Sequence, residues 1–142
     1  MVRASDARPQ PSNGKQQRAA SMHLQMYRHM VITRELSDRM FTLNRQGRAA
    51  FAVTGQGHEA AQIGSAYAIK KGTDWVLPYY RDIGVAITIG QTPRDLLLAM
   101  LSKAEDISSG GRNMPSHFSD PKLRIVAGSA PVATQLRKKM RA

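Results

Sequence analysis

The sequence PYYRD (residues 78–82) places a cation and two phenols directly after the apolar run 75–77. An arginine at this place can bind a phosphate through two parallel N–H bonds, and a tyrosine hydroxyl can donate to the same anion. The competing interpretation is structural, with Arg81 paired to Asp82 or Glu59 at the start of a helix. The residues alone favour this structural interpretation.

A second candidate is the sequence GGRNMPSHF (residues 110–118), which lies within the long polar stretch 108–120. Loops of this length in a compact domain tend to be either functional or disordered. His117 could act there as an acid, a base or a hydrogen-bond donor to a carboxylate. An exposed loop histidine without such a role is the simpler interpretation, and the residues alone favour it.

The third candidate is SAPVATQ (residues 129–135), where carbonyls and hydroxyls could coordinate a monovalent ion or cap a helix. Capping is the favoured interpretation. The remaining histidines have no metal-like spacing with acidic residues, so no zinc site is predicted. The chain has neither a GxGxxG motif nor a P-loop, and GQGH (residues 55–58) is only a fragment of such a pattern.

Helices are expected to position these segments. Ser21 is predicted to cap a long helix that runs to about Gln46, because apolar residues recur at near-helical spacing, and Gly47 suits the position that ends it. A second helix is predicted over about 58–70, where many small residues would let another backbone approach closely.

Two further helices and two extended segments complete the predicted elements. Asp82 could cap a short helix that ends at Ile89. Thr92 begins a stronger signal, because a proline at the first turn and an acidic residue three positions on follow this cap residue. Phe51–Val53 is predicted to be extended, and residues 125–127 are predicted to form a short strand.

Composition sets broad limits on the protein class. The length of 142 residues is that of one domain, and the chain has no cysteine, which excludes disulfides. No apolar run approaches the roughly 18 residues that would cross a bilayer. Four basic residues and one acidic residue lie in the first 20 positions, and six basic residues follow Asp120, so much of the net charge of +11 is near the termini. Terminal charge indicates solvated tails rather than a nucleic-acid surface.

The first 20 residues have the composition of a disordered tail. They contain no apolar core, so they are not a secretory signal. A mitochondrial transit peptide is the weaker interpretation, because the segment has no clear amphipathic face. A bacterial cytoplasm is therefore the expected location, with the mitochondrial matrix as the alternative.

Four segments together carry a resemblance. TGQGHEAAQIGSAYAI, DWVLPYYRD, GGRNMPSHFSDP and VAGSAPVATQ are similar, in order and spacing, to the alpha subunit of the thiamine-diphosphate-dependent dehydrogenase component of 2-oxo acid dehydrogenase complexes. The branched-chain (2-oxoisovalerate) type looks closest, and the pyruvate type comes next. The resemblance covers about residues 21–135. It implies an α/β thiamine-diphosphate-binding fold, incomplete here and mainly helical in the part present.

The resemblance implies roles for individual residues. The cofactor diphosphate would bind Tyr80 and Arg81, and the aminopyrimidine would lie near Ala130, Pro131 and Val132. The substrate would be surrounded by a larger set, in which His117 orients the 2-oxo acid and is the catalytic candidate: Phe51, Tyr80, Met114, Pro115, Ser116 and His117. A potassium ion would bind Ser129, the carbonyl of Pro131, Thr134 and Gln135.

The resemblance also implies partners and an expected boundary. The partners would be a beta subunit in an alpha2-beta2 tetramer, a lipoyl-bearing acyltransferase component and a small 2-oxo acid, with no nucleic acid and no membrane. The sequence departs from the family pattern at Leu136, and the magnesium ligands of the family are absent from the chain. Residues 136–142 are therefore interpreted as a basic tail from a truncated or frameshifted reading frame. The expected parent reaction is oxidative decarboxylation with acyl transfer to lipoamide, and the fragment alone is expected to be inactive. The alternatives are a non-catalytic fragment that binds the beta subunit, and a pyruvate dehydrogenase alpha subunit.

Overall fold

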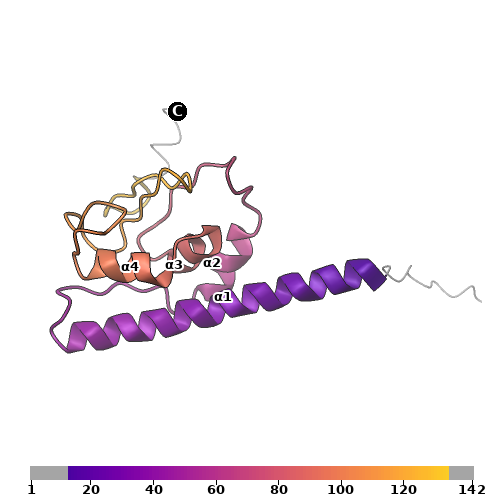
Figure 1. Cartoon of the computed structure of the whole chain (residues 1–142), viewed down its shortest axis with the longest axis horizontal. Helices are drawn as coiled ribbons and strands as arrows, with labels where there is room; N and C mark the ends of the chain where they lie inside the picture. Colours follow the sequence, from indigo (N-terminus) through magenta and orange to yellow (C-terminus); the bar gives the residue numbers. More distant parts are fainter. Residues whose placement is uncertain (1–12, 135–142) are drawn as a thin grey trace, which may run out of the picture.

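Four helices organise the computed structural model, which describes residues 13–134. They are α1 (Asn13–Arg45), α2 (Glu59–Ala66), α3 (Ile83–Ile89) and α4 (Pro93–Met100). Figure 1 shows α1 along one side of the molecule, with α2, α3 and α4 lying against it. The irregular segment 101–134 lies on the far side of these three helices from α1 (Figure 1).

Helix α1 begins earlier than the sequence predicts. It starts at Asn13, so Ser21 lies inside the helix and its hydroxyl donates to the carbonyl of Arg18 (2.8 Å) instead of capping. The prediction of a disordered tail is therefore wrong for residues 13–20, whose glutamines and alanines favour a helix. Its first part, residues 1–12, lies outside the described residues. The predicted end is confirmed closely, because the helix stops at Arg45 and Gly47 has a φ of +70°.

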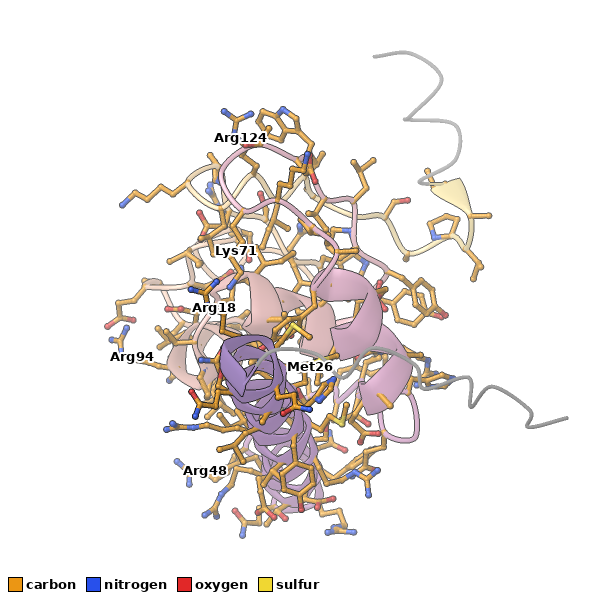
Figure 2. All side chains as sticks on the ribbon, turned by 90° about the vertical axis from the view of Figure 1, so that its right-hand side faces the viewer. Arg18, Met26, Arg48, Lys71, Arg94 and Arg124 are labelled. Atoms are coloured by element: carbon orange, nitrogen blue, oxygen red, sulfur yellow. The ribbon has the colours of Figure 1, made fainter. Side chains whose placement is uncertain are left out.

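The core is centred on α3, in which all seven residues are buried. Its sequence IGVAITI is almost wholly apolar, so it has no face that favours water. Apolar residues from every other part of the described chain pack around it: Leu36, Met40, Leu43, Ala49, Ala66, Leu96, Met100, Phe118 and Ile125. Figure 2, turned by 90°, shows α1 nearly end-on with the other helices on one side of it.

The capping predictions for α3 and α4 have opposite outcomes. Thr92 caps α4 as predicted, because its hydroxyl accepts from the N–H of Asp95 and the Asp95 carboxylate accepts from the N–H of Thr92, which completes a capping box. Asp82 precedes α3 but its side chain does not cap that helix. Its carboxylate instead accepts from the backbone N–H of Tyr79 (2.8 Å), and so it fixes the turn that carries Tyr80.

The strand predicted at residues 125–127 does not form within the described residues. Ile125 makes two isolated bridges, one parallel to Val76 and one antiparallel to Asp120. Each bridge joins a single residue pair, which is too short for a strand. The part of the chain that the structure describes is thus helical, and the α/β character of the predicted fold is not seen in it. Within residues 13–134, no helix combines the length and apolarity needed to cross a membrane.

Candidate functional site

Four segments that are separated in the sequence meet at one pocket, here called the Tyr80 pocket. Its volume is about 240 Å³. It is lined by residues from the segment before α2, the turn before α3, the loop 108–120 and the segment after Ile125: Phe51, Val53, Tyr80, Arg81, Met114, Pro115, His117 and Ala130. The structure therefore brings together two of the candidate segments recognised in the sequence and one residue of the third.

Aromatic contacts fix the relative positions of the turn and the loop. The rings of Tyr79 and Tyr80 have centroids 4.0 Å apart, and the Tyr80 ring stacks on that of His117 at 6.4 Å with an interplanar angle of 24°. The guanidinium of Arg81 lies 5.7 Å from the centroid of the Tyr80 ring, which is within the range of a cation–π contact. Tyr80 therefore touches both the cation and the imidazole of the pocket.

Arg81 has no acidic partner within residues 13–134. Its Nη1 donates to the backbone carbonyl of Thr54 at 3.1 Å, and it forms no ion pair with Asp82 or Glu59. Glu59 is instead paired with Arg34 of α1, at 2.6 Å between Nε and Oε1. The structural interpretation of Arg81 as a helix-start ion pair is thus wrong. Since a guanidinium carries five N–H donors, most of those of Arg81 remain available to an anion.

The imidazole of His117 is oriented by backbone carbonyls. Its Nδ1 lies 3.2 Å from the carbonyl oxygens of both Met114 and Pro115. A carbonyl only accepts hydrogen bonds, so these contacts favour the tautomer with the proton on Nδ1. In the neutral ring, Nε2 then keeps its lone pair and can accept a proton or a hydrogen bond.

Ser116 lies beneath the pocket rather than in its wall. It is buried, has a φ of +66°, and its hydroxyl lies 3.4 Å from the carbonyl of Val53. The strained turn at Ser116 lets both of its neighbours, Pro115 and His117, line the pocket. Ser116 therefore supports the structure of the pocket and is not part of its lining.

The segment after Gly128 contributes one residue to the pocket lining. Ala130 lines the pocket, whereas Pro131 and Val132 are exposed and lie outside the lining. The hydroxyl of Ser129 is buried and has no hydrogen-bond partner in the described part of the chain. The hydroxyl of Thr134 donates to the carbonyl of Pro131 at 2.8 Å.

Two groups beside the pocket have shifted pKa values. The hydrogen bond with Tyr80 raises the pKa of Tyr79, with a contribution from burial, although the Arg81 side chain acts in the opposite direction. Burial raises the pKa of Asp82, although the N–H of Tyr79 and the charge of His58 act in the opposite direction. A neighbouring cavity of about 310 Å³ lies next to these groups and shares Arg81 with the Tyr80 pocket.

Comparison with known proteins bears on what such an arrangement does. Residues 27–140 match the family model of the dehydrogenase E1 component. The chain belongs to this family. Its matched region includes every residue of the Tyr80 pocket and all the segments that carry the resemblance seen in the sequence.

Relatives of this E1 component chain are alpha subunits. It is 50% identical over 111 residues to the 2-oxoisovalerate dehydrogenase subunit alpha of Bacillus subtilis, covering 78% of this chain and 34% of that protein. It is 44% identical over 68 residues to the 3-methyl-2-oxobutanoate dehydrogenase subunit alpha of Mycobacterium tuberculosis, covering 48% and 18%. With the mitochondrial 2-oxoisovalerate dehydrogenase subunit alpha of Dictyostelium discoideum the identity is 34% over 113 residues, covering 80% and 25%. The chain thus spans about a third or less of the length of these relatives.

Residues that the sequence did not single out also shape the site. Val53 lines the pocket, Gln62 binds the backbone of Arg81, and Asp106 organises the loop that carries His117. The only sequence signal for Gln62 is its place one turn after Glu59, beside the apolar Ile63 on the inner face of α2. For Asp106 the signal is the following pair of serines and glycines, which is typical of a carboxylate that accepts from nearby backbone N–H groups.

Proposed function

We propose that this chain is part of the alpha subunit of a branched-chain 2-oxo acid dehydrogenase and supplies one wall of its thiamine-diphosphate and substrate site. The observation that carries the proposal is the Tyr80 pocket, in which a stacked tyrosine, an oriented histidine and an arginine without an acidic partner among the described residues face the same space. The overall reaction of such an enzyme is oxidative decarboxylation of the 2-oxo acid with acyl transfer to lipoamide.

The residues fit an anionic cofactor. The guanidinium of Arg81 uses one N–H for the carbonyl of Thr54, so it can still make two parallel bonds to a diphosphate oxygen pair. The Tyr80 hydroxyl would donate to the same group. Ala130 would lie against the cofactor, and the exposed Pro131 and Val132 would approach it when it binds. When bound, thiamine diphosphate supplies the nucleophilic carbon that reacts with a keto group.

The other pocket residues fit a 2-oxo acid with an aliphatic side chain. Phe51 and Met114 are exposed apolar side chains beside the pocket, and a branched hydrocarbon could cover them. His117 would orient the substrate carboxylate or keto oxygen, or move a proton, through its Nε2 atom. Pro115 and Ser116 would hold that imidazole in place.

The remaining assignments extend the proposal by the resemblance to the family. A potassium ion would be held by Ser129, Pro131 and Thr134, and the buried hydroxyl of Ser129 fits an oxygen-donor site because it lacks another partner among the described residues. Gln135, the fourth residue of that site, lies outside the described residues. A beta subunit and a lipoyl-bearing acyltransferase would be the partners. The bacterial relatives favour the bacterial cytoplasm as the location.

The test is a titration of thiamine diphosphate with magnesium, followed by the fluorescence of Trp75, the single tryptophan of the chain. Arg81→Ala is expected to weaken binding by about 1.5–3 kcal/mol, because a charge-assisted bond to phosphate is lost. Arg94→Ala is the matched control, since Arg94 is an exposed arginine in the first turn of α4. Equal dissociation constants for Arg81→Ala and Arg94→Ala would remove Arg81 from the cofactor site.

Activity with the beta subunit decides the substrate. In a subunit extended to the full length of the family, the rate with 3-methyl-2-oxobutanoate is expected to exceed the rate with pyruvate. In the same subunit, His117→Ala is expected to lower turnover more than cofactor affinity. A preference for pyruvate would support the pyruvate dehydrogenase alternative. Cofactor-independent binding to the beta subunit, with no decarboxylation, would support the non-catalytic alternative.

A further inference from the structure

We propose that Gln62 is the positioning residue that sets Arg81 in the geometry needed to bind an anion. This inference rests on the proposed role of Arg81 in the cofactor site. Gln62 lies on α2 and has no place in the lining of the Tyr80 pocket, although it lines the neighbouring cavity of about 310 Å³ together with Arg81. Its action on a ligand in the Tyr80 pocket would therefore pass through the backbone of Arg81.

The side-chain amide of Gln62 binds two backbone groups on either side of the start of α3. Its Nε2 donates to the carbonyl of Arg81 at 2.9 Å, and its Oε1 accepts from the N–H of Gly84 at 3.0 Å. The residue is only 7% exposed. Water therefore has little access to replace either bond. Loss of the Oε1 bond leaves the N–H of Gly84 without its partner, whereas the carbonyl of Arg81 keeps a second donor, the N–H of Ile83 at 2.8 Å.

The neutral amide of Gln62 satisfies both contacts at every pH near neutral. The carbonyl of Arg81 needs a donor and the N–H of Gly84 needs an acceptor, so the orientation of the Gln62 amide is determined by its partners. A carboxylate would keep the bond to Gly84 but would place an acceptor against the Arg81 carbonyl. An aliphatic side chain of similar size would lose both bonds.

Two glycines leave the space that the amide of Gln62 occupies. A Cβ added to Gly84 would lie 2.8 Å from Oε1 of Gln62, and a Cβ added to Gly55 would lie 2.7 Å from Nε2. The added atom at Gly55 would also collide with the carbonyl oxygen of Arg81. The backbone at Gly55 and Gly84 thus approaches the Gln62 amide more closely than a residue with a Cβ would permit at either position.

The consequence is that Arg81 is held at both of its ends. Its carbonyl is bound by Gln62 and its guanidinium by the carbonyl of Thr54, the residue that precedes Gly55. Loss of the first bond leaves the N–H of Ile83 as the remaining donor to this carbonyl, so the peptide between Arg81 and Asp82 is held less tightly. The guanidinium would then be ordered by the anion at the moment of binding, and this ordering weakens affinity.

The test measures binding of inorganic pyrophosphate to the complete 142-residue chain by calorimetry, under conditions where circular dichroism shows each variant folded. Gln62→Glu at pH 7.5 is expected to bind pyrophosphate roughly two- to tenfold more weakly, as one backbone partner is lost. Gln62→Leu is expected to show at least the same loss. Gln91→Glu and Gln91→Leu are the matched controls, since Gln91 is equally buried (4% exposed) but follows the other end of α3.

A pH series separates positioning from general destabilisation. A protonated glutamic acid can donate to the Arg81 carbonyl and accept from Gly84, so it restores both bonds of Gln62. The affinity ratio between Gln62→Glu and the unmodified chain is therefore expected to approach one as the pH falls toward 5. The chemical shift of the Gly84 amide should stay near its normal value in Gln62→Glu and move in Gln62→Leu.

The outcomes distinguish this inference from the proposed function. If Arg81→Ala loses pyrophosphate affinity while both Gln62 variants keep it, the positioning role is wrong and the cofactor role of Arg81 stands. If the Gln91 variants lose as much affinity as the Gln62 variants, the positioning role is also wrong. If the unmodified chain and Arg81→Ala bind pyrophosphate equally, both proposals fail together.

Discussion

Replacement of Asp106 by alanine should unfold the loop that carries His117. The carboxylate of Asp106 accepts from four donors within the next five residues: the N–H groups of Ser108 (3.0 Å), Ser109 (3.0 Å) and Gly111 (3.2 Å), and the hydroxyl of Ser109 (2.8 Å). It is 6% exposed. The hydroxyl of Ser108 then accepts from the N–H of Ser119, which closes the base of the loop.

The expected loss of unfolding free energy follows from these contacts. A hydrogen bond to a charged group contributes about 1.5–3 kcal/mol, and bonds that share one acceptor are not additive. The Asp106→Ala variant also leaves three partly buried N–H groups without this acceptor. We therefore expect it to lose about 3 kcal/mol of unfolding free energy, which lowers the urea midpoint by roughly 1–2 M for a chain of this size.

The pH dependence gives a second signature of Asp106. Burial acts to raise the pKa of its carboxyl, but the donors from Ser108, Ser109 and Gly111 outweigh burial and lower the pKa overall. A lowered folded-state pKa contributes stability above the unfolded pKa of about 3.9, and this contribution is lost as the pH falls through the folded value. The difference between the unmodified chain and Asp106→Ala should hence be constant near neutral pH and shrink below about pH 4.

The assay combines urea unfolding with hydrogen exchange of the loop amides. Glu105→Ala is the control, because it removes the same charge from an exposed neighbour that makes no side-chain hydrogen bond in the described part of the chain. Faster exchange at Ser109 and Gly111 is expected only in Asp106→Ala. Equal urea midpoints for the Asp106 and Glu105 variants at pH 7 would refute the reasoning.

Two other features give testable effects on stability. The Arg34 guanidinium lowers the pKa of Glu59, although burial acts in the opposite direction. Glu59→Gln should therefore lower the free energy of unfolding by about 1–3 kcal/mol at pH 7, and this loss should diminish below about pH 4. Urea unfolding at pH 7 and pH 3.5 measures both values, and a loss that does not change with pH would contradict the ion-pair explanation. Thr92→Ala removes one half of the capping box and should cost about 0.5–2 kcal/mol, with faster amide exchange confined to the first turn of α4; unchanged exchange there would contradict it.

Two features that depend on residues close together in the sequence were predicted correctly. The capping box at Thr92 and the end of α1 before Gly47 follow from residues within a few positions of each other, and both predictions are confirmed. The start of α1 was placed wrongly at Ser21, because a residue that suits a cap can also sit inside a helix and donate to the preceding turn. The strand at residues 125–127 failed for a different reason, since its pairing depends on partners that a single segment does not specify.

The candidate site shows the same difference between contacts within a segment and contacts between distant segments. The sequence alone assigned Arg81 to an ion pair, because an acidic neighbour is the nearest partner along the chain. The structure instead joins Arg81 to Thr54 and Gln62, which are 27 and 19 positions away. Side chains that act across such separations leave no periodic signal, so Gln62 could be found only after α2 and the turn before α3 were placed together.

Preorganisation of Arg81 links the fold to the proposed function. A free arginine side chain loses roughly 2 kcal/mol of rotamer entropy when an anion fixes it. In this chain the backbone of Arg81 is bound by Gln62, its Nη1 is bound by Thr54, and its planar face lies beside the Tyr80 ring. Much of the ordering has therefore taken place before any ligand arrives, and the N–H groups that remain can meet a diphosphate with less loss of freedom. Since α2 supplies Gln62 and the small residues of α2 and α3 allow their close contact, the packing of two short helices would set the affinity of the proposed site, although neither helix lines the Tyr80 pocket.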